Sequence, residues 1–246
     1  MKMSRWWITA SITMILFSAA VYLLHYAIFR DAQNIFTFMI RNIAFVPIQI
    51  LLMTLIIDRL LNQREKRLRL EKLNMVIGTF FSEVGGSLLA YLSDIDPDLE
   101  KIRKDLIITG DWADSDFMNI ERRLKNYTYE IEEGRIDCDY MRGFLSDKRN
   151  FLLRLLENPN LLEHESFTEL LRAVFHATEE FSSRSSFENI PETDLKHLGG
   201  DLKRVYALLV HQWVDYMKYL KYNYPYLFSL AMRQNPFDEE ASPEVG

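Results

Sequence analysis

The stretch "RNIAFVPIQILLMTLIIDRLLNQREKRLR", residues 41–69, places an apolar run directly before a run of positive charge. Residues 43–57 contain no ionisable side chain, and a dense group of basic residues follows them. Two structures produce such a pattern: a helix that leaves a membrane, or a buried helix of a soluble protein whose charged end meets water. The choice between them decides how the rest of the chain is organised.

A second apolar segment lies near the start of the chain. Residues 6–29, "WWITASITMILFSAAVYLLHYAIF", have no ionisable side chain except His25. As a helix they reach about 36 Å, which exceeds the hydrocarbon core of about 30 Å. A cleaved signal peptide has a shorter apolar region and a small-residue cleavage site, whereas the bulky "HYAIFRD" follows here. Residues 6–29 are therefore predicted to span a membrane.

The apolar run of residues 43–57 is short for a second span. Adding residues 36–42 gives a span at about 36–57, which then includes Arg41 and Asn42. An arginine near the end of a span extends its stem toward the headgroups, so its cost is lower than at the bilayer centre. Pro47 is expected to kink this helix. With a connection at residues 30–34, the sequence predicts a transmembrane hairpin in residues 1–57.

Basic residues flank the expected hairpin on one side of the membrane. Lys2 and Arg5 precede the first span, and a basic cluster follows the second. The positive-inside rule then places both chain termini in the cytoplasm, with the protein in the cell (inner) membrane. The bilayer is thus the first expected partner. The residues expected to contact lipid headgroups are Arg59, Arg64, Lys66, Arg67 and Arg69.

The charge is distributed unevenly along the 246-residue chain, whose net charge is −6. Residues 1–57 hold four of the 29 basic residues and one of the 35 acidic residues, so the remainder is acidic. Nucleic acid is therefore a poor candidate for a partner, because binding to its backbone needs a basic face. The single cysteine, Cys138, makes no internal disulfide and fits a reducing, cytoplasmic setting.

Polar residues recur on one face of each expected span. Seven-residue spacing places them on a common helix face, and the antiparallel hairpin brings the two faces to similar depths. Hydrogen bonds between helices, within the hairpin or a homo-oligomer, are one interpretation. A polar pathway through an oligomer is the other, although the chain has no TVGYG filter. The residues are Ser11, Ser18, Tyr22, His25, Arg41, Asn42 and Gln49.

After residue 57 the helix is expected to continue as a basic juxtamembrane stalk over residues 58–95. Apolar residues return at spacings of three and four, which predicts that the stalk packs toward its end. Gly85 and Gly86 are expected to bend or end it. The stretch "SDIDPD", residues 93–98, marks a boundary, with Asp96 as the N-cap of the next helix. The inward positions are Leu73, Ile77, Phe80, Val84 and Leu88.

Start and stop signals predict further helices in a cytoplasmic domain of residues 96–237. No segment shows sustained period-two alternation between hairpin turns, so the fold is predicted to be all-α. The acidic tail, residues 238–246, is expected to be disordered. The expected helices cover 99–108, 117–132, 138–157 after the cap Asp137, 166–181, 193–222, and a short helix between Pro225 and Pro236.

The stretch "YNYPYLFSLAMRQNPF", residues 222–237, carries a family resemblance together with "LLEHESFTELLRAVFH", residues 161–176. They resemble the C-terminal signature of a family of prokaryotic membrane proteins with two spans and a helical cytoplasmic region. The resemblance covers the final third of the chain and transfers no catalytic residue. The aromatic residues of the first stretch are expected to close the domain core rather than lie on a membrane.

Two histidines have carboxylates at helical neighbour spacing. His176 precedes Glu179 and Glu180, and His197 lies between Asp194 and Asp201. Helix bundles build carboxylate-bridged metal sites from such pairs, but the usual Glu-x-x-His order is absent. Solvated helix faces are the alternative. The metal-ligand candidates are His176, Glu180, His197 and Asp201; no catalytic motif or cofactor-binding loop is recognised.

Three functional hypotheses follow from these features. The first is a membrane-anchored helical interaction protein that recruits a cytoplasmic protein partner or a second copy of itself. The second is a subunit of an oligomeric channel or transporter lined by the polar residues of the spans. The third is a metal-dependent helical enzyme that uses the His–carboxylate candidates. The sequence favours the first.

Overall fold

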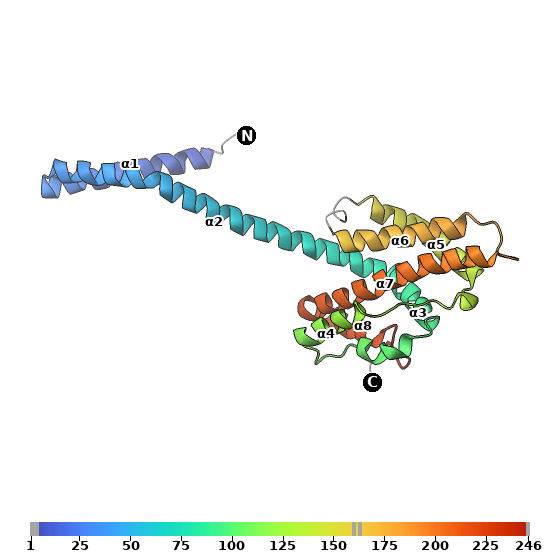
Figure 1. The fold of residues 1–246 in the computed structure, drawn as a ribbon. Coiled ribbons are helices and arrows are strands. Elements are labelled where there is room, and N and C mark those ends of the chain that lie inside the picture. Colours follow the sequence, from blue (N-terminus) through green and yellow to red (C-terminus); the bar gives the residue numbers. More distant parts are fainter. Residues whose placement is uncertain (1–4, 159–160, 162–163, 245–246) are drawn as a thin grey trace. The chain divides into compact units, whose positions relative to one another are not determined.

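The computed structural model describes residues 5–158, 161 and 164–244, except for the side chains of residues 5, 7, 8 and 69 (Figure 1). The protein is all-α, with 79% of the chain in helices and no strand among the described residues. Lys2 and the side chains of Arg5 and Arg69 lie outside this description. The chain divides into two compact units, residues 1–66 and residues 67–246, and each is described by itself.

The first unit contains helix α1, Arg5–Phe29, and the first part of helix α2, Ala32–Phe80. Arg30 and Asp31 alone join the two helices. Asp31 Oδ1 accepts a hydrogen bond from the Asn34 N–H at 3.0 Å, so this carboxylate caps the N-terminus of α2. The predicted connection at residues 30–34 is therefore wrong in length, because the cap lets α2 begin three residues before Ile35.

The apolar side chains of the first unit are exposed. Phe17 of α1 is 72% exposed and Leu51 of α2 is 60% exposed, and no described side chain from residue 9 to residue 66 is buried. By length and composition, α1 from Thr9 to Phe29 and the apolar part of α2 are each long enough to cross a membrane. This unit therefore has no hydrophobic core of its own.

The second unit begins within α2, at the point where buried side chains return. The five stalk positions predicted to face inward are all buried, which confirms that part of the sequence analysis. The helix then changes to a π-helix, η1, at Phe81–Gly85, and resumes as α3, Gly86–Asp94. A Cβ at Gly86 would lie 2.9 Å from the Phe81 carbonyl oxygen, so the widened turn needs glycine there.

The remaining helices pack around α7. Helix α6 packs against both α5 and α7, and α7 also contacts α3, α4 and α8 (Figure 1). Two 3₁₀ turns, η2 and η3, connect α3 to α4, and η4 precedes α5. The bounds are η2 Leu99–Lys101, η3 Arg103–Leu106, α4 Asp114–Leu124, η4 Glu133–Arg135, α5 Cys138–Leu156, α6 Glu165–Ser182, α7 Glu192–Asn223 and α8 Pro225–Arg233.

Three local predictions in this unit were wrong. The helix expected at residues 99–108 is replaced by the 3₁₀ turns η2 and η3, because the backbone at Ile102 leaves the helical region with φ −129°. The helix expected at residues 117–132 ends at Leu124, and the chain then runs without regular structure, with Tyr129 packed 5.2 Å from the Tyr206 ring of α7. Asp96 does not cap a helix. Its buried carboxylate accepts hydrogen bonds from the Tyr127 hydroxyl at 2.6 Å and the Asp98 N–H at 2.9 Å. Burial raises the pKa of Asp96.

The C-terminal aromatic stretch closes the core only in part, because Tyr222 and Tyr226 are 53% and 70% exposed. Phe228 of α8 and Phe237 after it are buried. Asn235, which lies between them in the sequence, is also buried. Its Nδ2 donates a hydrogen bond to the Leu106 carbonyl at 2.9 Å, and its Oδ1 accepts one from the Phe237 N–H at 3.0 Å. The first hydrogen bond fastens the segment after α8 to the turn η3, and the second orders that segment locally.

Candidate functional site

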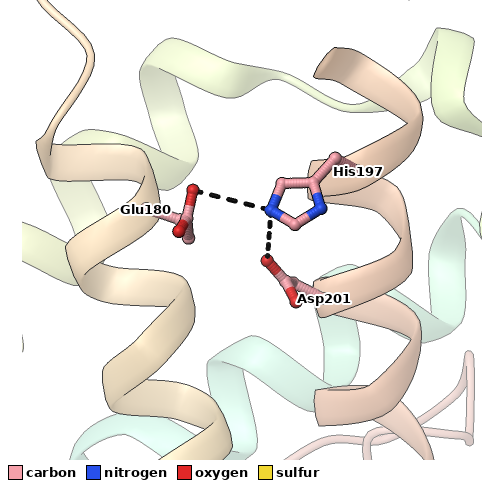
Figure 2. A group of neighbouring side chains, drawn as sticks. All are labelled: Glu180, His197 and Asp201. Carbon is pink, nitrogen blue, oxygen red and sulfur yellow. Dashed lines mark ion pairs between the residues drawn. The ribbon is translucent and has the colours of Figure 1, made fainter. Parts of the chain in front are cut away.

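Helices α6 and α7 bring the four metal-ligand candidates into one cluster. His176 and Glu180 lie one turn apart on α6, and His197 and Asp201 lie one turn apart on α7. Figure 2 shows Glu180 reaching across from one helix toward His197 and Asp201 on the other. Packing of the two helices thus converts two i, i+4 pairs into one His–carboxylate group, named here the α6–α7 cluster.

The ring nitrogens of the cluster face its carboxylate oxygens. His197 Nε2 lies 3.7 Å from Glu180 Oε2 and 3.6 Å from Asp201 Oδ2. His176 Nε2 lies 3.6 Å from the same Asp201 oxygen and 4.0 Å from Glu180 Oε1. These separations exceed the usual hydrogen-bond range of about 2.7–3.2 Å, so the four groups converge without direct hydrogen bonds between them.

Burial differs between the two kinds of group in the cluster. The side chain of Asp201 is 17% exposed, and its Oδ2 atom is fully buried with no hydrogen-bond donor among the described residues. The side chains of His176 and His197 are 55% and 54% exposed. The cluster therefore has a buried anionic end and a solvent-accessible imidazole end.

An arginine holds one carboxylate of the cluster in place. Arg184 Nη1 lies 3.0 Å from Glu180 Oε2, and the same guanidinium makes two hydrogen bonds to Asp194, at 2.8 and 2.6 Å. Hydrogen bonding from Arg184 lowers the pKa of Glu180 and the pKa of Asp194. The sequence analysis missed Arg184, which lies two residues beyond the end of α6, so helical spacing from Glu180 did not point to it.

Two carboxylates that the sequence places near the histidines form ion pairs with arginines instead. Glu179, a neighbour of His176 in sequence, forms an ion pair with Arg149 at 2.8 Å instead. Asp194, which precedes His197 by three residues, pairs with Arg184. Among the described residues, Glu180 and Asp201 are therefore the carboxylates within 4.0 Å of the imidazole nitrogens, and Asp194 lies beside them.

A hollow of about 740 Å³ lies elsewhere in the second unit, between α2, η1, α3, α7 and α8. Its wall includes the stacked ring of Tyr216, which lies 5.4 Å from Phe81. Concave surfaces rich in aromatic side chains are typical of sites for apolar groups. The sequence analysis did not find this hollow, because its lining comes from five separate elements. Its other aromatic residues are Trp213, Tyr219, Tyr224 and Tyr226.

The polar residues expected on the faces of the two spans are all exposed on α1 and α2. Tyr22 lines a shallow hollow of about 280 Å³ with residues from both helices. The His25 ring lies 4.8 Å from the Phe29 ring, and the Arg41 guanidinium lies 5.3 Å from the Phe38 ring. The same two helices carry the rest of this set: α1 contains Ser11 and Ser18, and α2 contains Asn42 and Gln49.

The basic residues after the apolar part of α2 are exposed on the helix surface where the structure describes their side chains. Arg59, Arg64 and Lys66 are exposed. Arg67 forms an ion pair with Glu71 at 3.1 Å, one helical turn later. The side chain of Arg69 lies outside the described residues.

These features define a class of protein with two helical domains, the first bare and apolar and the second packed around its own core. Comparison with known families gives the same division: residues 2–61 match the MJ1433 N-terminal helical domain, and residues 69–233 match the C-terminal helical domain of uncharacterized protein MJ1433. The chain belongs to this family. The junction between the two matches includes residues 66 and 67, where the structure divides.

One relative matches nearly the whole chain. Uncharacterized protein MJ1433 of Methanocaldococcus jannaschii is 44% identical over 241 residues, which cover 98% of this chain and 97% of the relative. No solved structure matches the chain. The family match extends over both domains, beyond the C-terminal third that carried the resemblance in the sequence.

Proposed function

We propose that this protein is a membrane-anchored helical interaction protein. In this proposal α1 and residues 32–57 of α2 form a two-span hairpin, and the hairpin holds the helical domain at the cytoplasmic face of the cell membrane. There the domain receives a cytoplasmic protein partner or a second copy of the chain. The observation that carries the proposal is the bare apolar surface of the first unit.

The size of that surface decides between water and lipid. Between residues 6 and 57, 28 large apolar side chains are exposed. Fully burying one such side chain from water is worth about 1.5–3 kcal/mol, and these are 37–75% exposed, so together they favour an apolar environment by roughly 25–50 kcal/mol. A whole domain is stable by only about 5–15 kcal/mol. Because the apolar residues surround both helices rather than forming a stripe, lipid is the best cover for them.

The hydroxyl groups of the hairpin are compatible with lipid. Thr9 donates to the Trp6 carbonyl, Thr13 to the Thr9 carbonyl and Thr37 to the Gln33 carbonyl, each at 2.9 Å. A hydroxyl that hydrogen-bonds within its own helix avoids the cost of an unsatisfied polar group in hydrocarbon. These side chains therefore add little to the cost of insertion.

The charges support a cytoplasmic domain. The exposed residues Arg59, Arg64 and Lys66 follow the second apolar segment, whereas the connection between the helices has one arginine and one aspartate, Arg30 and Asp31. Positive charge at the cytoplasmic ends of spans is the main determinant of orientation. It also attracts the anionic lipids of that leaflet.

Membrane fractionation and cysteine labelling test the proposal. Variants Ala32→Cys and Glu240→Cys, each in a Cys138→Ala background, are treated in intact cells with an impermeant thiol reagent. We expect the protein to remain in the membrane pellet after alkaline carbonate washing, with position 32 labelled and position 240 protected. Permeabilised cells, in which both positions react, are the control. Recovery in the supernatant without detergent would remove the anchor, and labelling of position 240 alone would reverse the topology.

A further inference from the structure

We propose that His176, Glu180, His197 and Asp201 form a binding site for one divalent transition-metal ion, which joins α6 to α7. The site goes beyond membrane anchoring and does not depend on it, since all four residues belong to the second unit. Two imidazole nitrogens and two carboxylates are a donor set that suits Zn²⁺ and its neighbours in the first transition row.

The cluster has nearly the dimensions of a tetrahedral zinc site. Zinc bonds to nitrogen and oxygen of about 2.0–2.1 Å place neighbouring ligand atoms about 3.3–3.4 Å apart in a tetrahedron. The four nitrogen–oxygen separations in the cluster are 3.6, 3.6, 3.7 and 4.0 Å. Ligand atoms of Glu180, His197 and Asp201 all lie within 4.8 Å of one another. Glu180 faces His197 with Oε2 and His176 with Oε1, so the side chains of Glu180 and His176 must rotate before one ion contacts all four residues.

Asp201 is the second observation that points to a cation. Both histidine Nε2 atoms lie 3.6 Å from its Oδ2, which is buried and has no hydrogen-bond donor among the described residues. A buried carboxylate oxygen without a donor is unfavourable, and proteins usually satisfy it. A cation between this oxygen and the two imidazoles gives it a partner.

The local charge also favours a divalent ion. Three carboxylates, those of Glu180, Asp194 and Asp201, lie in or beside the cluster, and Arg184 pairs with the first two. With neutral imidazoles this set has two uncompensated negative charges, which one divalent cation balances. Arg184 holds Oε2 of Glu180 and leaves Oε1 facing His176, as a residue that orients a metal ligand does.

The test uses the full chain, solubilised in detergent and purified without a polyhistidine tag. After incubation with Zn²⁺ and removal of unbound metal, we expect one zinc ion per chain by elemental analysis. Thermal unfolding should shift to higher temperature with Zn²⁺, because the ion binds the folded state. Substitution of Co²⁺ should give the visible absorption of a tetrahedral cobalt complex.

Single substitutions assign the metal to the cluster. Asp201→Asn, His197→Gln and Glu180→Gln should each weaken zinc binding by more than about 100-fold, since even residues behind the ligands change affinity by about 10–100-fold. Arg184→Gln should fall within that smaller range. Glu179→Gln is the matched control, because Glu179 adjoins Glu180 on α6 but pairs with Arg149, and it should bind zinc as the wild type does.

A footprint on the wild type tests the site without any variant. Zinc should protect His176 and His197, but not His164 or His211, from modification by diethylpyrocarbonate. Less than about a tenth of an ion per chain at micromolar zinc, or equal modification with and without zinc, would overturn the site. Zinc binding that survives Asp201→Asn, or unfolding that depends on pH but not on zinc, would show that the cluster is an ion-pair network only.

Discussion

The two units of this protein use apolar side chains in opposite ways. In α1 the apolar residues surround the helix, and the described ones are all exposed or partly exposed. In α6 they form a stripe: Phe167, Leu170 and Val174 are buried, while Glu169 and Arg172 point to water. The arrangement of polar residues around a helix, rather than its apolar content, thus decides whether it builds a protein core.

Helix α2 contains both arrangements in one element. Leu51 is 60% exposed, whereas Ile77, on the same helix, is 1% exposed. The change follows the polar segment at residues 62–67, after which apolar residues recur with helical spacing. Secondary structure is the same on both sides of that segment. What differs is the material that covers the side chains, which we propose is lipid for the first part and protein for the second.

The largest expected effect contrasts two phenylalanines. Phe80 is fully buried and lies 5.4 Å from the Phe167 ring, so Phe80→Ala should lower the free energy of unfolding by about 3–5 kcal/mol. Phe17 is 72% exposed, and Phe17→Ala should leave the unfolding of the helical domain unchanged. Urea unfolding of the solubilised chain, followed by tryptophan fluorescence, measures both. Equal losses would mean that the two units share one core.

A charged residue introduced into the first unit should weaken membrane association and leave the stability of the helical domain unchanged. Phe17 lies at the middle of α1, and an arginine there should disfavour membrane insertion by about 2.5–3.5 kcal/mol. We expect Phe17→Arg to reduce the fraction that resists carbonate extraction without changing the urea midpoint of the helical domain. Phe17→Leu serves as the control. An unfolded helical domain with intact membrane association would contradict the proposed division of roles.

A smaller effect concerns how the second unit closes. Asn235→Ala removes the partners of the Leu106 carbonyl and the Phe237 N–H, and a buried polar group left without a partner costs about 1–3 kcal/mol. The control is Asn223→Ala, because Asn223 is exposed and donates only to the Tyr219 carbonyl in its own helix. If both variants unfolded at the same urea concentration, Asn235 would have no closing role.

The smallest expected effect is a pH dependence. Burial lowers the pKa of His164 and of His211 from the ordinary value of 6.5. Below about pH 6.5 the unfolded chain then binds more protons than the folded chain, so the free energy of unfolding falls as the pH falls. Above about pH 6.5 both histidines are neutral in either state, and they add no further pH dependence. The double variant His164→Asn, His211→Gln should flatten the urea midpoint between pH 7.5 and 5.5. An unchanged slope would assign the dependence to other groups.

Much of the fold follows from local sequence signals. Asp137 accepts a hydrogen bond from the Tyr140 N–H at the start of α5, and Pro225 begins α8, as their positions predicted. The helix predicted through residue 132 failed for a tertiary reason. The side chains of Tyr129 and Ile131 alternate into the core from an irregular segment, and this burial outweighs the helical pattern of the preceding residues.

The α6–α7 cluster marks the limit of such reasoning. Each His–carboxylate pair is visible in the sequence because both members lie one turn apart on one helix. Nothing local shows that α6 and α7 pack in the register that brings the pairs together. The local sequence also does not show that Glu179 forms an ion pair with Arg149, or that Asp194 forms one with Arg184.

Spin labels placed one at a time at residues 12–24 of α1, in a Cys138→Ala background and in liposomes, test the central claim most directly. The account predicts that every position in this range is shielded from a water-soluble relaxation agent, and that the positions facing away from α2 are accessible to oxygen dissolved in the lipid. Positions open to the water-soluble agent at intervals of three and four residues would contradict it, because one face of the helix would then line water.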